Sequence, residues 1–355
     1  MSAAGRAGEA VFRSGEAAAC PENGSARRRA NLSFFVPHAG CPHRCLFCDQ
    51  AGISGRASGP TPDEVRAACE EHLSDRPDRR YEIAFFGGSF TAIDRRYMTA
   101  LLEAAAPFVR AGRAAGIRLS TRPDAVDDET LRLLRSFGVT AVELGAQSMD
   151  DAVLRANGRG HTAEDVRRAS AAVKAAGLEL GLQMMVGLYG ETDPEEAARQ
   201  TAYALAALRP DTVRIYPTLV LEGAGLAALW RAGRYRPLTL EQAIAVTAPL
   251  LSFFEEQGIR VIRAGLHAEP GLESCLLAGP WHPAFRDLCE GWLLRQAIQY
   301  LLASAPRGAY TVYVAPGGES RAAGNGRCNL RYFGQQGYRL TIRPRTGPGR
   351  YQAEL

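Results

Sequence analysis

The stretch NLSFFVPHAGCPHRCLFC, residues 31–48, decides how the rest of the chain is interpreted. Its first part, 32–36, is a short apolar run of the kind that forms a buried strand. Three cysteines follow at once, Cys41, Cys45 and Cys48, with the spacing C-x3-C-x2-C. Three thiolates in one short loop after a strand can converge on a single soft-metal centre.

The number of cysteines in this loop separates two kinds of metal site. A structural zinc site takes four ligands, and the nearest candidates for a fourth, His38 and His43, lie at unusual spacings. A cubane iron–sulfur cluster held by three cysteines leaves one iron open to an outside ligand. Among the other cysteines, Cys275, Cys289 and Cys328 are separated by 14 and 39 residues, which matches no ligand pattern. We therefore expect no auxiliary cluster.

A regular alternation of strands and helices extends from this stretch. Further short apolar runs have the length of buried strands, at 81–86, 117–120, 139–145, 178–186, 212–216 and 259–263. Helical patterns lie between them, at 62–74, 95–111, 127–137, 163–176, 193–208 and 240–257. Repeated βα units of about 30 residues imply a parallel sheet with helices outside. Six units are too few for a full eight-stranded barrel, so the sequence predicts an α/β fold, a partial (β/α)6 TIM-like barrel with its chemistry at the carboxyl ends of the strands.

The chain divides into three predicted parts. Residues 1–30 are small, polar and without periodicity, which predicts a disordered N-terminal tail and not a signal peptide. Residues 31–265 form the predicted barrel, and 266–355 form a small C-terminal α+β appendage. Within the appendage the pattern predicts a loop at 266–284, a helix at 284–303 and short strands at 310–314 and 338–343.

Composition excludes some classes of protein, and the distribution of charge suggests a partner. The chain is 46% hydrophobic and 23% charged, which excludes a wholly disordered protein, and it has no run of about 18 apolar residues that would span a membrane. The net charge of +4 is uneven, because 31–306 carries −4 and 307–355 carries eight arginines against two glutamates. A basic C-terminal segment suggests an anionic partner. The alternative is a solvated arginine-rich tail.

The cysteine loop resembles the cluster-binding motif of the radical S-adenosylmethionine (SAM) superfamily, including the aromatic Phe47 before the last cysteine. The later strand ends resemble the same superfamily. Over about residues 31–300 the set looks like the radical domain of the Elongator catalytic subunit and its bacterial relatives, with oxygen-independent coproporphyrinogen oxidase a more distant relative. That subunit's acetyltransferase domain is expected to be absent, since only about 50 residues follow the long helix, against well over 100 for such a domain.

The resemblance assigns roles to particular residues. Cys41, Cys45 and Cys48 match the ligands of a 4Fe-4S cluster, and Gly87 and Gly88 match the site of the methionine amino group of S-adenosylmethionine. The full set of expected cofactor contacts is Phe47, Gly87, Gly88, Ser89, Glu143, Gln147, Arg159 and Gln183. Ser89 stands where many members have Glu, and Gln183 where the coproporphyrinogen oxidase relatives have Asp. For Glu143 and Gln147, polar residues that cap strand ends are the alternative.

The resemblance also implies a reaction class. In the superfamily a reduced 4Fe-4S cluster cleaves S-adenosylmethionine to a 5′-deoxyadenosyl radical, which takes a hydrogen atom from the substrate. The implied partner is a one-electron reductant of the flavodoxin or ferredoxin type, and an oxygen-sensitive cluster implies a cytoplasmic location. The catalytic residues stay unknown. Tyr216 and His267 are candidates at strand ends, with a locally satisfied side chain as the alternative for each.

The substrate expected from this resemblance and from the basic segment is RNA, through tRNA modification. In that hypothesis one part of the segment holds phosphates and stacks bases: Arg321, Arg327, Arg331, Tyr332, Phe333 and Arg339. One alternative is a radical SAM enzyme that acts on a small metabolite or a tetrapyrrole. A second is a non-catalytic iron–sulfur protein that binds RNA, and a third is that the segment only covers the open side of the barrel.

Overall fold

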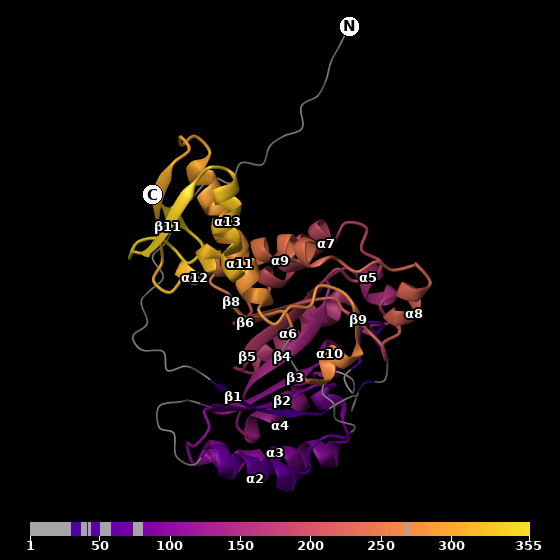
Figure 1. Ribbon diagram of the computed structural model, residues 1–355. Helices are drawn as coiled ribbons and strands as arrows, with labels where there is room; N and C mark the ends of the chain where they lie inside the picture. Colours follow the sequence, from indigo (N-terminus) through magenta and orange to yellow (C-terminus); the bar gives the residue numbers. More distant parts are fainter. Residues whose placement is uncertain (1–29, 37–40, 42–43, 50–57, 74–80, 267–269) are drawn as a thin grey trace.

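The computed structural model describes residues 30–36, 41, 44–49, 58–73, 81–266 and 270–355, and Figure 1 shows their arrangement. The predicted tail at 1–30 lies outside the described residues, apart from Ala30, which begins the first strand. In the part of the chain that the structure describes, no helix is both long enough and apolar enough to cross a membrane.

Seven parallel strands form the main sheet, in the order β1-β2-β3-β4-β5-β6-β8. Their bounds are β1 Ala30–Phe35, β2 Tyr81–Phe86, β3 Gly116–Thr121, β4 Val139–Gln147, β5 Glu179–Val186, β6 Thr212–Pro217 and β8 Arg260–Ala264. Consecutive strands are neighbours throughout, as expected for successive βα units. The carboxyl ends of all seven strands therefore meet at one edge of the sheet.

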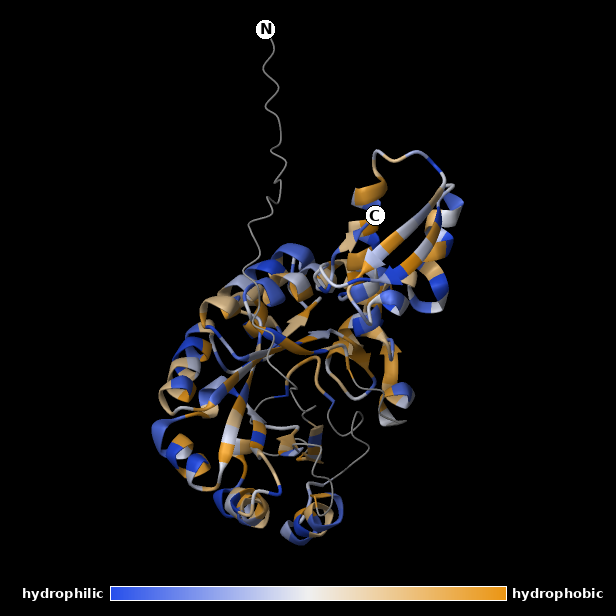
Figure 2. Cartoon of the chain, turned by 90° about the vertical axis from the view of Figure 1, so that its left-hand side faces the viewer, coloured by the Kyte–Doolittle hydropathy of each residue, from blue (hydrophilic) through white to orange (hydrophobic). Residues whose placement is uncertain are grey.

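Helices cover the outside of this curved sheet, and Figure 2 shows them ringed around it. They are α2 Pro62–Leu73, α3 Arg95–Arg110, α4 Asp128–Ser136, α6 Ala163–Ala175, α7 Pro194–Ala207 and α9 Leu240–Glu256. Two short helices, α5 Asp151–Ala156 and α8 Leu226–Arg231, lie instead at the carboxyl edge, where their ends bond to the backbone of Leu46. The helix-capping residues predicted from the sequence make the expected hydrogen bonds, as the start of α7 shows. Asp193 accepts hydrogen bonds from the backbone N–H groups of Glu195 and Glu196 at 3.0 and 3.1 Å, with Pro194 in the first helical position. The predicted α/β partial barrel is confirmed.

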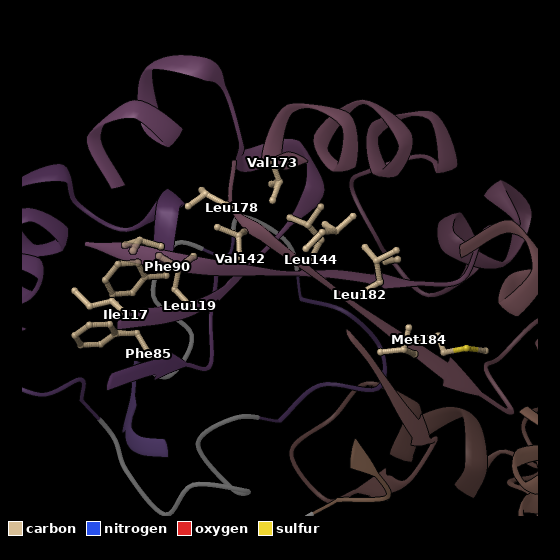
Figure 3. Packing of buried hydrophobic residues seen from close by; sticks show 14 of the residues in the cluster. Phe85, Phe90, Ile117, Leu119, Val142, Leu144, Val173, Leu178, Leu182 and Met184 are labelled. Atoms are coloured by element: carbon tan, nitrogen blue, oxygen red, sulfur yellow. The ribbon is translucent and has the colours of Figure 1, made fainter. Parts of the chain in front are cut away.

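The hydrophobic core lies between the outer face of the sheet and the helices. Alternate strand residues supply it, as Figure 3 shows for Phe85, Ile117, Leu119, Val142 and Leu144. Each of these is fully buried, and burial of such a side chain contributes about 1.5–3 kcal/mol. The residues between them point to the inner face, and several of those are charged.

The region after β8 departs from the predicted loop at 266–284. A short helix α10, Pro270–Cys275, and a strand β9, Leu276–Ala278, lie there instead. Strand β9 pairs antiparallel with β7, Val220–Leu221, which follows β6. Two- and three-residue strands leave no period to detect in a sequence, which is why the loop prediction was wrong.

A C-terminal unit, residues 285–355, follows. It contains α11 Phe285–Leu302, β10 Ala309–Val314, α12 Glu319–Ala323, α13 Cys328–Gln335, β11 Arg339–Pro344 and β12 Ala353–Glu354. Its three strands form a sheet in the order β11-β10-β12. The first part of α11 packs on the barrel core through Phe285 and Cys289, and its second part packs on the small sheet through Leu294 and Ile298. The first half of α11 is therefore anchored in the core of the barrel, and its second half in the core of the C-terminal unit.

Two residues of the segment expected to bind RNA have structural roles in this unit. Arg321 forms an ion pair with the buried Glu290 of α11. Phe333 is 1% exposed and belongs to the core under the small sheet. The base-stacking role predicted for Phe333 is wrong, because the packing of α13 against α11 buries its ring. Arg321 is partly exposed, and its predicted contact with phosphate stays a prediction.

Candidate metal and cofactor site

The cysteine loop is held at the carboxyl edge of the barrel by backbone hydrogen bonds from two distant segments. The N–H of Leu46 donates to the carbonyl of Asn157 at 3.0 Å, and the carbonyl of Leu46 accepts from the N–H of Leu226 at 2.7 Å. Asn157 is itself fully buried, and its side chain donates to the carbonyls of Val153 and Tyr189. The loop is therefore fixed from both sides, by the end of α5 and the start of α8.

The three cysteines lie near one another in this loop. Burial, followed by the charges of Cys45 and Cys41, raises the pKa of the Cys48 thiol to about 12. The Sγ of Cys41 lies 3.5 Å from the Oγ of Ser89, which is completely buried. Among the residues described, no three Cys, His, Asp or Glu side chains are arranged closely enough to hold a metal ion.

A cationic side chain faces these thiols. Arg159 donates from Nη1 to the Sγ of Cys45 at 3.3 Å and from Nη2 to the carbonyl of Gly145 at 2.6 Å. Its Nε is buried and has no hydrogen-bond partner within the described ranges. Soft thiol donors beside an arginine fit an iron–sulfur cluster, because the guanidinium offsets the negative charge of the thiolates. Binding such a cluster would release the thiol protons.

The glycines after β2 need their lack of a side chain. Gly87 and Gly88 have φ angles of +82° and +47°, in the left-handed region that favours glycine. A Cβ on Gly87 would lie 3.2 Å from the carbonyl oxygen of Val36 and 3.2 Å from the ring of Phe35. The turn thus brings backbone polar groups to the strand end, next to the cysteine loop.

Strand β4 ends in a bulge that turns Gln147 inward. The register between β4 and β5 shifts between Gly145 and Gln147, and Gln147 has a φ of +67°. A non-glycine residue in this conformation costs about 1–3 kcal/mol, so the surroundings must enforce it. The Nε2 of Gln183 on β5 donates to the Oε1 of Gln147 at 3.2 Å. The two glutamines therefore form one pair at the mouth of the barrel.

His161 supports this bulge from behind. Its Nε2 lies 3.1 Å from the carbonyl oxygen of Ala146, and its Nδ1 is buried without a partner in the part of the chain that is described. Burial, and then the charge of Arg159, lower the pKa of His161 to about 4, so the ring is neutral near pH 7. A neutral ring has one N–H, which donates to Ala146. Nearby, Arg122 and Asp124 form a local ion pair.

Glu143, expected to contact the cofactor, lies deeper in the barrel and already has charged partners. Its carboxylate accepts hydrogen bonds from Arg214 at 2.6 and 2.9 Å and from Arg118 at 3.3 Å, and it is 3% exposed. Arg118 also contacts Glu82 and Glu179. Arg118 and Arg214 were not among the residues that the sequence predicted for the site. The available signal was a charged residue at alternate positions of otherwise apolar strands.

The structure describes one of the two candidate catalytic residues. Tyr216 lies on the inner face of β6, where its hydroxyl is 3.5 Å from Nη1 of Arg214 and its ring packs in a small cluster with Phe47 and Met185. It is therefore close to the cysteine loop, between that loop and the buried charges. His267 lies outside the described residues.

Two side chains that the sequence did not single out hold the turn after β5, one from the turn itself and one from the segment after α8. Tyr235 donates to the carbonyl of Gly187 at 2.6 Å, and Glu191 accepts from the N–H of Gly187 at 3.0 Å. Burial raises the pKa of Glu191 to about 8, although these backbone hydrogen bonds oppose the shift. Both side chains fix the turn that borders the candidate site.

The three cysteines for which an auxiliary cluster was considered, Cys275, Cys289 and Cys328, are in unrelated environments. Cys289 is fully buried in the barrel core, Cys328 is exposed on α13, and Cys275 donates to the carbonyl of Leu272 at 3.4 Å.

Known proteins with similar sequences include enzymes that modify tRNA. The chain is 27% identical over 247 residues to the tRNA uridine(34) acetyltransferase of Methanocaldococcus jannaschii, an alignment that covers 58% of this chain and 45% of that protein. It is 34% identical over 145 residues to Elongator complex protein 3 of Homo sapiens, covering 39% of this chain and 26% of that protein. The chain spans about half the length of the tRNA uridine(34) acetyltransferases that it matches.

A solved structure shares the fold. The archaeal Elp3 of Methanocaldococcus infernus, with an N-terminal deletion, superimposes with a TM-score of 0.58 and 22% sequence identity, over 76% of this chain and 63% of that chain. At this identity the match supports the architecture of the barrel.

Two consecutive family models match this chain. The model of the radical SAM superfamily matches residues 35–202, which include the cysteine loop and the first five strand ends. The model of the radical SAM C-terminal domain matches residues 210–295. The chain therefore belongs to the radical SAM superfamily, whose members bind a 4Fe-4S cluster and S-adenosylmethionine.

Proposed function

We propose that this radical SAM enzyme acts on RNA, with tRNA as its substrate class, and that Cys41, Cys45 and Cys48 hold its cluster. One observation carries the assignment of the site. Arg159 joins the thiol of Cys45 to the carbonyl of Gly145, so the cysteine loop and the end of β4 form a single site. The polar strand ends of β4 and β5 border that site.

Each nearby residue has a role in this proposal. Arg159 supplies a positive charge for the carboxylate of the methionine moiety. Gly87 and Gly88 expose backbone groups to its amino group, and the pair Gln147–Gln183 offers amide donors and acceptors at the strand ends. When bound, the reduced cluster and S-adenosylmethionine together supply a 5′-deoxyadenosyl radical that can take a hydrogen atom from the substrate.

Exclusion of solvent is the contribution of the apolar side chains around the loop. Phe47 packs against two clusters, one with Val220, Leu226 and Tyr235 and the other with Met185. Val220, Leu226 and Met185 come from β7, α8 and β5, and Tyr235 comes from the segment after α8, so Phe47 of the cysteine loop has apolar neighbours from four segments. A dry site protects a radical from side reactions.

The RNA part of the proposal rests on similarity and charge. The curated relatives named tRNA uridine(34) acetyltransferase match this chain over 56–61% of its length. Because the chain spans only about half of those proteins, acetyl transfer is not carried over to it. The net charge of +6 in residues 307–355 favours an anionic macromolecule over a small neutral metabolite.

The test uses the full-length protein, reconstituted anaerobically with iron and sulfide, and tRNA isolated from cells that lack the gene. Wild type with dithionite and S-adenosylmethionine should form 5′-deoxyadenosine and a new nucleoside, detected by mass spectrometry after digestion of the tRNA. Cys45→Ala should lose the brown absorbance of the cluster and form neither product. Cys328→Ala, which removes an exposed thiol elsewhere, should behave as wild type.

Two results would contradict different parts of the proposal. Normal iron content and cofactor cleavage in Cys45→Ala would reject the assignment of the cluster ligands. If a metabolite extract free of RNA stimulated 5′-deoxyadenosine formation and tRNA did not, the RNA substrate would be rejected while the radical chemistry stood.

A further inference from the structure

One face of the small C-terminal sheet is open to solvent and rich in arginine. Along β11 the residues Leu340 and Ile342 point into the core of the unit. Arg339, Thr341 and Arg343 alternate with them and are exposed on the opposite face.

The neighbouring strand continues this face. In the parallel register of β10 and β11, Thr311 lies beside Thr341, and Tyr313 lies beside Arg343. Thr311 is exposed and Tyr313 is half-buried. The face is therefore a flat patch of arginine, threonine and tyrosine side chains, which we call the arginine face.

Most of the charge on the arginine face is not neutralised. Within the described ranges Arg339 and Arg343 have no carboxylate within ion-pair distance. Arg345, next on the same side, pairs with Glu354 and lies over the ring of Tyr313 at 4.2 Å from its centroid. The patch thus keeps a net positive charge.

Several arginines on the barrel helices, in contrast, form ion pairs with acidic residues. Arg66 pairs with Asp63 at 2.6 Å, and Arg167 pairs with Glu164 at 3.1 Å. Arg199 likewise pairs with Glu196 at 2.7 Å. Those pairs lie one turn apart on the same helix, whereas no acidic residue stands among β11 residues 339–344.

We propose that the arginine face binds the sugar–phosphate backbone of the RNA substrate, an inference that rests on the proposed function. Alternate residues on a strand are about 6.6–6.8 Å apart, so the side chains of Arg339, Thr341 and Arg343 form an evenly spaced row. A guanidinium group can hold a phosphate with two parallel hydrogen bonds, and threonine hydroxyls are common donors to phosphate oxygens.

The chemistry of the face favours RNA over a membrane surface. A membrane-binding face combines basic residues with large apolar side chains that insert between lipids. Between the two unpaired arginines the exposed side chain is Thr341, and its neighbour on β10 is Thr311. Hydroxyl groups there suit a hydrated phosphate backbone.

The experiment measures binding of unfractionated, fluorescently labelled tRNA by anisotropy between 50 and 200 mM KCl. Relative to wild type, the double variant Arg339→Ala/Arg343→Ala should bind about 10-fold more weakly at intermediate salt, and the slope of log Kd against log salt should fall by about 1.5. Arg339→Lys/Arg343→Lys should retain most of the affinity. The matched control is Arg167→Ala/Arg199→Ala, which removes two ion-paired arginines and should bind within about 2-fold of wild type.

Formation of 5′-deoxyadenosine without RNA is measured in parallel, because the arginine face is not part of the proposed cofactor site. If the double alanine variant binds tRNA with wild-type affinity and slope, the arginine face is not the RNA site, and the proposed function is unaffected. If wild type does not bind tRNA while it cleaves the cofactor, the RNA substrate and the arginine face are both rejected. If the arginines are needed only for binding to vesicles of anionic phospholipid, the face binds a membrane surface and the proposal is overturned.

Discussion

The barrel and the C-terminal unit both bury charged side chains, and they surround them in different ways. In the barrel Arg118 lies between Glu82, Glu143 and Glu179, at 3.1, 3.3 and 3.0 Å. The side chains of Arg118 and Glu143 are each 4% exposed, and that of Glu82 is 6% exposed. The charges come from neighbouring strands, β2 to β5, so the network lies on the inner face of the sheet, largely shielded from water.

In the C-terminal unit a single carboxylate is buried and its partners come from the surface. Glu290 is 1% exposed, and Arg286, Arg321 and Arg350 pair with it while keeping exposed fractions of 28%, 23% and 41%. These arginines come from α11, α12 and the segment before β12. The ion pairs therefore join three parts of the unit, and their cations remain hydrated.

The exposure of the partners determines how much stability is lost when one member of an ion pair is removed. A buried charge whose partner is removed cannot recover its solvation, whereas a half-exposed one can. The barrel network should therefore be the more sensitive of the two. Three stability measurements test whether the two regions differ in this way.

The largest effect is expected from Arg118→Met, which leaves three carboxylates facing one another with less compensation. We expect a loss of about 3–5 kcal/mol in the free energy of unfolding, measured by urea denaturation at pH 7. Adding Glu82→Gln should recover part of the loss, since it removes one of the carboxylates that then repel one another. The surface variant Arg167→Ala should cost at most about 0.5 kcal/mol. A loss below about 1 kcal/mol for Arg118→Met would mean that water reaches the barrel network.

The next effect concerns a carboxylate of the barrel that lies outside the charge network. The pKa of Glu191 is raised to about 8, mainly by burial, so ionisation of this group opposes folding. Its stability contribution is present below the unfolded pKa of about 4.5 and is lost as the pH rises through about 8. Glu191→Gln keeps an oxygen to accept from Gly187 and cannot ionise. Between pH 5 and 8 the free energy of unfolding of the variant should therefore rise by about 2–4 kcal/mol relative to wild type. Thermal denaturation at a series of pH values measures this difference.

A constant difference between wild type and Glu191→Gln across this pH range would contradict the assignment. It would show that Glu191 ionises freely in the folded protein.

The smallest effect is expected from Glu290→Gln in the C-terminal unit. Burial opposes ionisation of Glu290, but Arg286, Arg350 and Arg321 outweigh it and lower its pKa. Its contribution is therefore present above the unfolded pKa and is lost as the pH falls, opposite in sign to that of Glu191. We expect a loss of about 1–3 kcal/mol at pH 7, because the freed arginines can be hydrated.

Hydrogen exchange should show where that loss occurs. Amides of β10, β11 and β12 should exchange faster in Glu290→Gln, with those of the barrel strands unchanged. Equal acceleration in both regions would mean that the unit and the barrel unfold together.

The sequence predicted the barrel well because its strands and helices are long and periodic. The apolar run at 212–216 corresponds to β6, Thr212–Pro217, and the helix predicted at 240–257 corresponds to α9, Leu240–Glu256. The pair β7–β9 escaped prediction, since two or three residues have no detectable period. The expected cofactor residues at the ends of β2, β4 and β5 are grouped at one edge by the parallel order of the strands.

Local sequence could not show what surrounds each charge. Glu143 resembled a cofactor contact in sequence, yet Arg214 and Arg118 occupy its carboxylate. Arg321 and Arg339 belong to the same basic stretch, but one closes on Glu290 and the other faces solvent. The partners lie 25 to 71 residues away along the chain, so only the fold brings them together.

Three features could be inferred from the amino-acid sequence alone: the alternation of strands and helices, the position of the cysteine loop after the first strand, and the resemblance to the superfamily. These follow from local periodicity and from residue types at fixed spacing, which need no knowledge of distant contacts. The tertiary structure alone decided that Arg159 reaches the thiol of Cys45, that Glu143 is held by two arginines, and that Arg339 and Arg343 share an open face. Those outcomes depend on burial and on the register between strands, and the energy of a charge depends on both.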